Sequence, residues 1–326
     1  MKIKIPPPVS GGLIISYKCN SGCIHCLYNC GNEWNEWIDV KDAERYLKLL
    51  KSTGTFRSLH ITGGEPFMNF GLLCEIARIC KKTGIPTFVE TNCFWAVDDE
   101  KTERKLREVK KSGIESILIS CSPFYLEKIP FENFKRCLRI SEDVFGKENV
   151  MVYTREGCDW IESIGIKGKI SFHDFIKKVP HESFIKFLKN YIVPKGKCLY
   201  TLENFFYKYP AEKFLKQNCI ADFLNPYHIH VDLYGNYITS FCGGISIGKI
   251  EEVLRDGIDF DRKIILKMLS RNIGEFLQWA EKLGYKRKDG YINKCHICLD
   301  IRRYLVVEKN MEFEELQPAG FYKRLP

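Results

Sequence analysis

Three cysteines near the start of the chain, Cys19, Cys23 and Cys26, form a C-x3-C-x2-C arrangement. Thiolates at this spacing can hold three corners of a cubic iron–sulfur cluster and leave the fourth iron open to another ligand. An open iron is a site for chemistry, whereas a fully ligated cluster mainly carries electrons. Cys30 extends the run to four cysteines, so a closed cluster or a zinc ion is the alternative interpretation of the same residues.

A second motif, Gly63-Gly64-Glu65-Pro66, directly follows a strand-like segment at residues 58–62. Glycines allow the backbone to approach a ligand closely. Glu65 offers a carboxylate to an ammonium group, and Pro66 prevents the strand from continuing. The cysteine run also follows a strand-like segment, so both motifs are expected at strand ends.

Together the cysteine loop and the GGEP turn resemble the radical S-adenosylmethionine (SAM) enzymes. The resemblance implies a [4Fe-4S] cluster on Cys19, Cys23 and Cys26, with SAM chelating the open iron and Gly63, Gly64 and Glu65 lying along its methionine part. It further implies reductive cleavage of SAM to a 5′-deoxyadenosyl radical, which takes hydrogen from an unactivated C–H bond. The electron would come from an external donor such as flavodoxin or ferredoxin. Cys30 is then expected to be a bystander.

The resemblance also suggests further SAM contacts. The position before the third cysteine, usually aromatic in the family, is His25, whose ring can stack near the adenine or simply lie half-exposed on the loop. Polar residues at the ends of later strands are candidates for the ribose and the carboxylate: Thr91, Asn92, Ser120 and Arg155. Each of these could equally cap a neighbouring helix. The family's Gly-x-Ile-x-Gly adenine motif is not evident, unless residues 164–168 are a remnant of it.

Four more cysteines form a second set, in which two flank a hairpin pattern at 228–238 and two form a C-x2-C pair: Cys219, Cys242, Cys295 and Cys298. This arrangement resembles the auxiliary-cluster domains called SPASM and twitch. Four thiolates suit one further [4Fe-4S] cluster, as in the shorter twitch type, and the cluster would accept the electron left after hydrogen abstraction. A structural zinc site is the alternative.

Strand and helix patterns alternate in the first half of the chain, which predicts an α/β fold with parallel strands. The expected strands are 12–17, 58–62, 86–90, 116–120 and 149–153, and the expected helices are 40–52, 71–82, 99–112 and 130–145. The resemblance implies that these close into a partial (β/α)6 barrel with the site at the carboxyl ends of the strands. A sixth strand is expected near 164–170.

The pattern changes in the second half, where a hairpin turn at Tyr234-Gly235-Asn236 precedes a helical segment at 264–283. We therefore expect a radical SAM partial barrel at 1–210 and a small α+β auxiliary iron–sulfur domain, twitch- or SPASM-like, at 211–326.

The composition suits a folded enzyme, since 45% of the 326 residues are hydrophobic. Fifteen cysteines, an odd number, favour reduced thiols that serve metal clusters over a disulfide framework. No apolar run could span a bilayer and no secretory signal is evident, so we expect a cytoplasmic protein without a membrane partner. The net charge of +9 is best explained by a lysine-rich surface, because no nucleic-acid-binding module stands out.

These patterns favour a radical SAM enzyme with an auxiliary cluster that acts on a peptide or a small molecule. Many auxiliary-cluster relatives modify peptides, but a cysteine loop that begins at residue 19 leaves no room for an amino-terminal domain that binds a leader peptide. One alternative is oxidation or rearrangement of a sugar or nucleoside metabolite by the same chemistry. Another is a non-catalytic iron–sulfur or zinc module for redox sensing.

Overall fold

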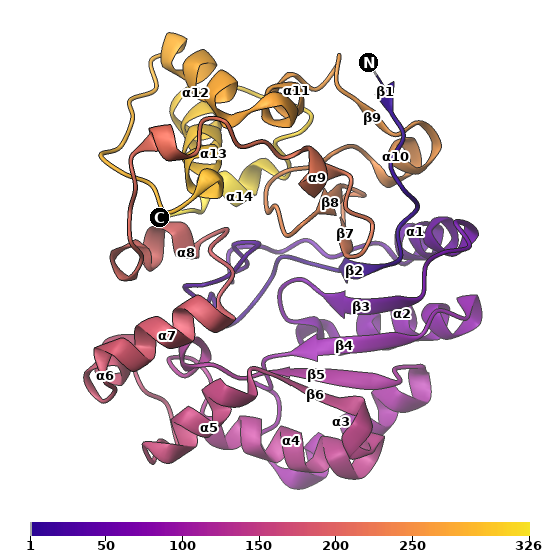
Figure 1. The fold of residues 1–326 in the computed structure, drawn as a ribbon. Coiled ribbons are helices and arrows are strands. Elements are labelled where there is room, and N and C mark those ends of the chain that lie inside the picture. Colours follow the sequence, from indigo (N-terminus) through magenta and orange to yellow (C-terminus); the bar gives the residue numbers. More distant parts are fainter. Residues whose placement is uncertain (1) are drawn as a thin grey trace. The chain divides into compact units, whose positions relative to one another are not determined.

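The computed structural model describes residues 2–326, and the chain divides into two compact units (Figure 1). The N-terminal unit comprises Gly11–Cys23 and Cys30–Ile192. The C-terminal unit comprises the residues up to Ser10, the short segment Ile24–Asn29 and Val193–Pro326. The expected domain boundary after residue 210 thus lies inside the C-terminal unit, and the cysteine loop is divided between the two units.

The N-terminal unit contains a sheet whose strands follow the order β6-β5-β4-β3-β2. Their bounds are β2 (Ser10–Ile14), β3 (Ser58–Thr62), β4 (Thr87–Thr91), β5 (Ser116–Ser120) and β6 (Val150–Tyr153). Strands β3 to β6 pair in parallel, each with the next along the chain. The helices between successive strands are α1 (Val40–Ser52), α2 (Phe70–Thr83), α3 (Asp99–Ser112) and α4 (Phe131–Phe145). The predicted α/β class with parallel strands is confirmed.

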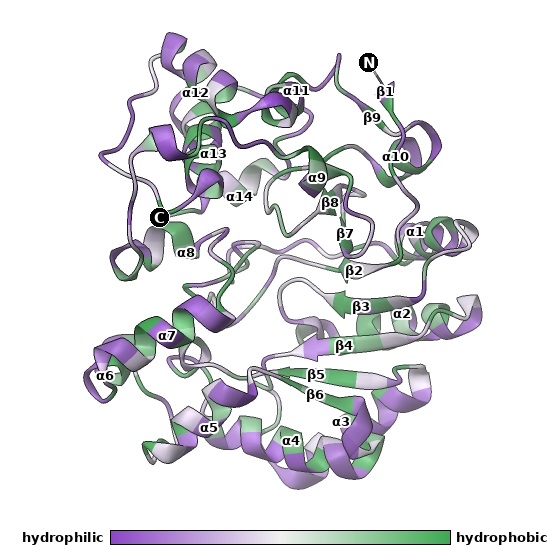
Figure 2. Cartoon of the chain, viewed as in Figure 1, coloured by the Kyte–Doolittle hydropathy of each residue, from purple (hydrophilic) through white to green (hydrophobic). Residues whose placement is uncertain are grey.

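Local signals explain where these helices begin and end. The side chain of Asp39 accepts a hydrogen bond from the amide of Lys41 and caps α1, and Asp98 caps α3 in the same way. Helix α2 ends at Gly84, whose φ of 65° places it in the left-handed region. The strands carry the apolar residues of the core, while the helices alternate between apolar and hydrophilic residues (Figure 2).

The prediction of a sixth strand at 164–170 is wrong. Helix α5 (Arg155–Ser163) precedes this segment, and helices α6 (Phe172–Lys177) and α7 (His181–Tyr191) follow it. The carbonyl groups of Lys167 and Gly168 accept hydrogen bonds from the first amides of α4. Because the segment caps a helix, its backbone groups are not available to a strand partner, and residues 164–168 form a helix-capping loop.

In the C-terminal unit, β7 (Ile229–Asp232) and β8 (Tyr237–Thr239) form the predicted antiparallel hairpin. Asp232 accepts hydrogen bonds from the amides of Tyr234 and Asn236, which fixes the turn. A second antiparallel pair joins β1 (Lys2–Ile3) to β9 (Ile258–Asp259).

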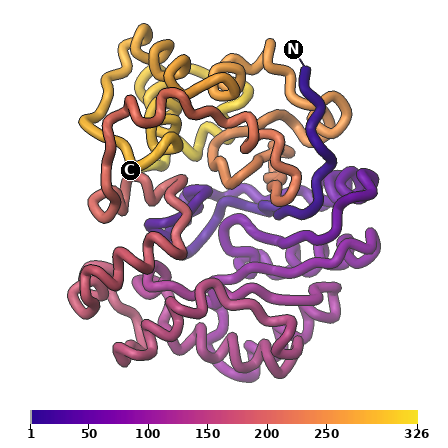
Figure 3. The backbone as a smooth tube through the Cα atoms, in the orientation of Figure 1, coloured from indigo at the N-terminus to yellow at the C-terminus, as the bar shows by residue number. Residues whose placement is uncertain are grey.

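The helices of this unit can be followed along the chain in Figure 3. They are α8 (Cys198–Thr201), α9 (Ile220–Phe223), α10 (Ile250–Asp256), α11 (Ile264–Arg271), α12 (Ile273–Lys282), α13 (Lys294–Arg303) and α14 (Ala319–Lys323). The segment expected to be helical at 264–283 is broken at Asn272, whose extended backbone ends α11 and whose side chain caps α12. Across residues 2–326, no helix combines the length and apolar character needed to cross a membrane.

Candidate active site

The GGE turn after β3 is hydrogen-bonded to the residues that lead into the first cysteine. The amide of Gly64 donates to the Ser16 carbonyl at 2.7 Å, and the amide of Glu65 donates to the Lys18 carbonyl at 2.9 Å. A Cβ atom at Gly63 would overlap the Ser16 carbonyl oxygen, and one at Gly64 would overlap that of Lys18. Only glycine allows the two backbone segments to lie this close. The structure therefore brings the two predicted motifs together.

Glu65 links the ends of β3 and β4. Its buried carboxylate accepts hydrogen bonds from the Asn92 amide at 2.7 Å, the Thr91 hydroxyl at 2.9 Å and the Phe67 amide at 3.2 Å. Burial raises the pKa of Glu65 to about 7, although these three donors favour the charged form. Three of its acceptor positions are thus occupied within the protein. Its expected contact with the amino group of SAM stays a prediction.

Asn92 extends this group of residues to the cysteine loop. Its side-chain amide donates to Asn20 at 2.9 Å and to Ser21 at 3.1 Å, and it lies 3.9 Å from the Cys19 sulfur. The Ser21 amide also donates to the same sulfur at 3.4 Å. Donors directed at a sulfur favour its thiolate form, which is the form that binds iron. These contacts fit a metal-ligating role for Cys19.

The structure adds two aromatic residues that the sequence patterns missed. The Trp95 indole donates to the Thr91 hydroxyl at 2.9 Å, and its ring stacks on Phe67 with centroids 4.2 Å apart. Neither residue lies in a recognisable motif, so no local pattern could have identified them. Cys30, expected to be a bystander, is buried and its thiol donates to the Gly63 carbonyl at 3.2 Å.

The remaining expected SAM contacts lie outside this hydrogen-bonded group. Ser120 is the half-buried last residue of β5, and Arg155 is the exposed first residue of α5. His25 is half-buried, and desolvation lowers its pKa to about 4. Its ring is therefore neutral at physiological pH, which suits stacking. All three assignments stay predictions.

The third cysteine lies in the part of the loop that belongs to the C-terminal unit. The Cys26 carbonyl accepts a hydrogen bond from the Lys197 amide at 3.0 Å, and the Ile24 carbonyl accepts one from the Thr201 hydroxyl. Gly196 has a φ of 65°, and a Cβ atom there would lie 2.8 Å from the Cys26 carbonyl oxygen. The position of Cys26 is thus determined by residues far away in the sequence.

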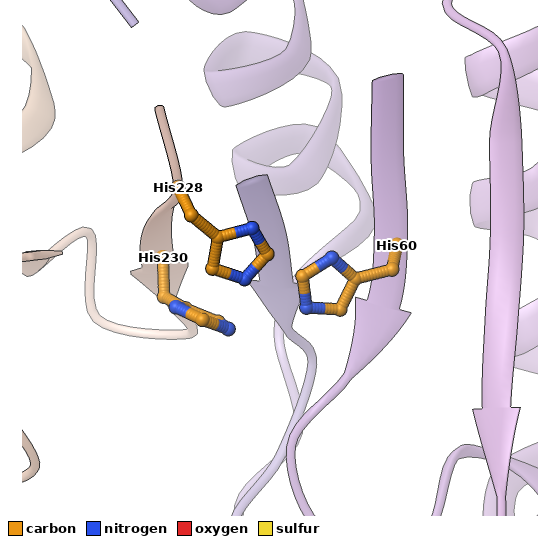
Figure 4. A group of neighbouring side chains, drawn as sticks. All are labelled: His60, His228 and His230. Carbon is orange, nitrogen blue, oxygen red and sulfur yellow. The ribbon is translucent and has the colours of Figure 1, made fainter. Parts of the chain in front are cut away.

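The histidines on the strands have structural partners within their own units. On β7, His230 lies 3.0 Å from the Tyr28 hydroxyl through Nδ1, and its ring is 4.9 Å from that of the preceding His228 (Figure 4). On β3, His60, which Figure 4 also draws, stacks on Phe88 with ring centroids 5.2 Å apart, and burial lowers its pKa to about 4. The contact between His230 and Tyr28 further anchors the segment that carries Cys26.

The second cysteine set surrounds a single cavity within the C-terminal unit. Cys219 precedes α9, Cys242 follows β8, and the other two lie on α13. All four line the cavity: Cys219, Cys242, Cys295 and Cys298. Burial raises the pKa of Cys219 and of Cys242, and that of Cys295 to about 12. Buried thiols of this kind lose their protons readily only to a metal or another strong positive charge.

Two lysines and an aspartate border the same cavity. Lys195 Nζ donates to the Ser240 carbonyl at 2.6 Å and lies 3.8 Å from Asp222. Lys294 Nζ donates to Asp222 at 2.7 Å. Four soft sulfur donors in cationic surroundings suit an anionic tetrathiolate centre, either a [4Fe-4S] cluster or zinc.

A parallel α/β sheet with a three-cysteine loop and a glycine turn at its strand ends defines a class of cluster-binding enzymes. The profile of the Radical SAM superfamily matches residues 13–191, and this chain belongs to that superfamily. Membership makes the chain an enzyme whose family uses a [4Fe-4S] cluster and SAM.

Curated relatives match over part of their length. The uncharacterized protein MJ0907 of Methanocaldococcus jannaschii is 31% identical over 107 residues, which is 31% of this chain and 36% of the relative. The putative peptide biosynthesis protein YydG of Bacillus subtilis is 19% identical, over 38% of this chain and 39% of the relative. The GTP 3′,8-cyclase of Heliobacterium modesticaldum is 27% identical, over 39% and 36%. The matches thus span less than half of each relative.

Two solved structures match a larger share of the chain, at lower sequence identity. Streptococcus suis SuiB bound to S-adenosylmethionine has a TM-score of 0.39 at 17% identity, over 71% of this chain and 60% of that one. BtrN in an open conformation has a TM-score of 0.40 at 11% identity, over 81% and 86%.

Proposed function

We propose that this chain is a radical SAM enzyme that abstracts hydrogen from a peptide or small-molecule substrate. Cys19, Cys23 and Cys26 would ligate the [4Fe-4S] cluster. In its reduced form that cluster supplies the electron that splits SAM into methionine and a 5′-deoxyadenosyl radical. The observation that carries the proposal is the backbone pairing of the GGE turn with Ser16 and Lys18, directly before the first ligand. An external flavodoxin or ferredoxin would supply the electron.

The residues of the strand ends have different roles in this proposal. Gly63 and Gly64 let the turn after β3 pack directly against the backbone of Ser16 and Lys18, beside the part of the cysteine loop where the methionine part of SAM would lie. Glu65 holds Thr91 and Asn92 in place, and the Asn92 side-chain amide donates to Asn20 and Ser21, which follow Cys19 in the loop. The chain's own contribution is to orient the cofactors and to exclude competing hydrogen donors.

We further propose that the four cysteines of the C-terminal unit bind a second [4Fe-4S] cluster, in a twitch- or SPASM-like domain that follows a partial β/α barrel. Their convergence on one cavity lined with basic side chains supports this assignment. Such a cluster would accept the electron left on the substrate after hydrogen abstraction, so that the net reaction is an oxidation.

The substrate class has two candidates. The similarity to YydG, a putative peptide biosynthesis protein, favours a peptide. The similarity to a GTP 3′,8-cyclase favours a nucleotide or related metabolite as the second candidate. Incubation with each class and detection of substrate-dependent 5′-deoxyadenosine would decide between them.

The decisive experiment is anaerobic reconstitution followed by iron counting and a 5′-deoxyadenosine assay with SAM and dithionite. The intact chain should hold about eight irons and release 5′-deoxyadenosine. Joint replacement of Cys19, Cys23 and Cys26 by alanine should abolish that product and leave about four irons. As a control, Cys74→Ala removes a buried thiol of α2 and should change neither quantity. An intact chain that binds iron but never yields 5′-deoxyadenosine would contradict the proposal.

A further inference from the structure

Arg302 is a buried cation on the helix that carries two of the four cysteines. On α13, Cys295, Cys298 and Arg302 are spaced by three and then four residues, so they lie on one face of the helix. Arg302 is 5% exposed and lines the same cavity as the cysteines. The sequence contains this pattern, C-x2-C-x3-R, but the motifs recognised in the sequence include its cysteines and not Arg302.

The hydrogen bonds of Arg302 are incompletely satisfied by the protein. One terminal nitrogen, Nη1, donates to the Gly243 carbonyl at 3.0 Å and to the Tyr322 hydroxyl at 2.6 Å. The Nε atom is buried and has no hydrogen-bond partner anywhere in residues 2–326. Buried N–H groups of this kind nearly always have an acceptor, and in a side chain that lines a cavity a missing acceptor is explained by an ion, a ligand or a water molecule bound there.

The charge of Arg302 is also uncompensated. Lys195 and Lys294 both lie beside the carboxylate of Asp222. Across the described residues, no carboxylate pairs with Arg302, yet an arginine stays charged at any physiological pH. A buried charge that lacks a counter-ion is strongly unfavourable, so an anion is expected in the cavity that it lines.

We propose that Arg302 is a positioning residue that donates its Nε hydrogen to a sulfur atom of an anionic tetrathiolate cluster and makes that cluster a better electron acceptor. This inference rests on the second cluster of the proposed function. Four thiolates around a [4Fe-4S] core of charge 2+ give a net charge of −2, and reduction by one electron, without a proton, gives −3. A fixed positive charge stabilises the second state more than the first. Hydrogen bonds to cluster sulfurs act in the same direction.

The test measures the reduction potential of the second cluster alone. In the full-length chain with Cys19, Cys23 and Cys26 all replaced by alanine, the reconstituted cluster is titrated with dithionite and redox mediators and followed by electron paramagnetic resonance. Arg302→Met should make the cluster at least tenfold harder to reduce at a fixed potential, equivalent to a fall of about 59 mV for a one-electron couple. Arg302→Lys keeps the charge and should retain part of the effect. Arg303→Met, on the same helix but outside the cavity lining, removes an equal charge and serves as the control.

The possible outcomes separate this inference from the proposed function. About four irons with a potential unchanged in Arg302→Met would overturn the role of Arg302 and leave the second cluster standing. Zinc in place of iron would overturn both the role of Arg302 and the second [4Fe-4S] cluster, without bearing on the cluster of Cys19, Cys23 and Cys26. If Arg302→Met fails to fold, Arg302→Lys decides, because a potential equal to that of the unmodified site would show that the geometry of the guanidinium has no effect.

Discussion

At the GGE turn, one additional methyl group would be enough to disturb the cluster site of Cys19, Cys23 and Cys26, here called the first site. Gly63 and Gly64 lie where a methyl group would collide with the carbonyls of Ser16 and Lys18. Glycine is therefore required at both positions for steric reasons, because the turn after β3 contacts the backbone of Ser16 and Lys18. The motif itself could be found in the sequence, but the atoms that make its glycines necessary could not.

Gly64→Ala should therefore disrupt the first site. The added Cβ atom would displace Lys18 and with it the neighbouring Cys19. We expect iron binding at this site to fall and 5′-deoxyadenosine formation to drop by roughly tenfold or more. Gly71→Ala is the matched control, since a Cβ atom at that position of α2 meets no atom within 4 Å. Equal activity in the two variants would argue against the close approach.

Glu65 makes the stability of the apoprotein depend on pH in a defined direction. Burial raises its pKa from 4.5 to about 7, so between these values the folded chain binds a proton that the unfolded chain releases. Its contribution to stability is complete below pH 4.5 and is lost as the pH rises through 7. Urea unfolding should show a steeper decline with rising pH in the intact chain than in Glu65→Gln. Parallel profiles would contradict the raised pKa.

At the scale of elements, local patterns predicted most of the N-terminal unit. The bounds of α1, β3, α3 and β5 agree with the expected ranges because each element has a clear apolar period and a polar cap or turn. The wrong prediction of a sixth strand has a non-local cause. Residues 164–170 contain strand-forming isoleucines, but their carbonyls cap α4, and such a distant backbone partner leaves no trace in a local pattern.

Asn293 caps α13, the helix that carries Cys295 and Cys298 of the second cysteine set. The Asn293 side chain accepts a hydrogen bond from the His296 amide at 2.9 Å and donates to the Pro194 carbonyl at 2.9 Å. Asn293→Ala should cost about 1 kcal/mol of unfolding free energy and make the second site lose iron faster to a chelator. Asn272→Ala removes the equivalent cap of α12, which carries no cysteine. It should cost similar stability without the faster iron loss, and equal rates in both variants would refute the link.

At the scale of the whole molecule, the cysteine loop belongs to two units. The segment Ile24–Asn29 is held by backbone and side-chain contacts to Lys197, Thr201, His230 and Phe321. The cysteine motif alone gives no indication of this division, because the division results from contacts with residues far along the chain.

Gly196→Ala should consequently impair the first site from a distance. The new methyl group would lie 2.8 Å from the Cys26 carbonyl oxygen, so the segment must shift. We expect less iron at the first site and less 5′-deoxyadenosine. Gly165→Ala is a closely matched control, because that glycine also has a positive φ, 71°, but its added Cβ atom meets nothing within 4 Å. If both variants lose activity equally, backbone strain rather than displacement of Cys26 is responsible.

The division of the cysteine loop also governs how this chain could be recombined with its relatives. The chain passes between the units after Ser10, Cys23, Asn29 and Ile192. A chimera joined once, after Ile192, would combine a foreign C-terminal unit with a native Ile24–Asn29 segment that had evolved against different neighbours. A viable exchange would have to transfer this hexapeptide and the residues up to Ser10 as well, so the smallest interchangeable module is discontinuous in sequence.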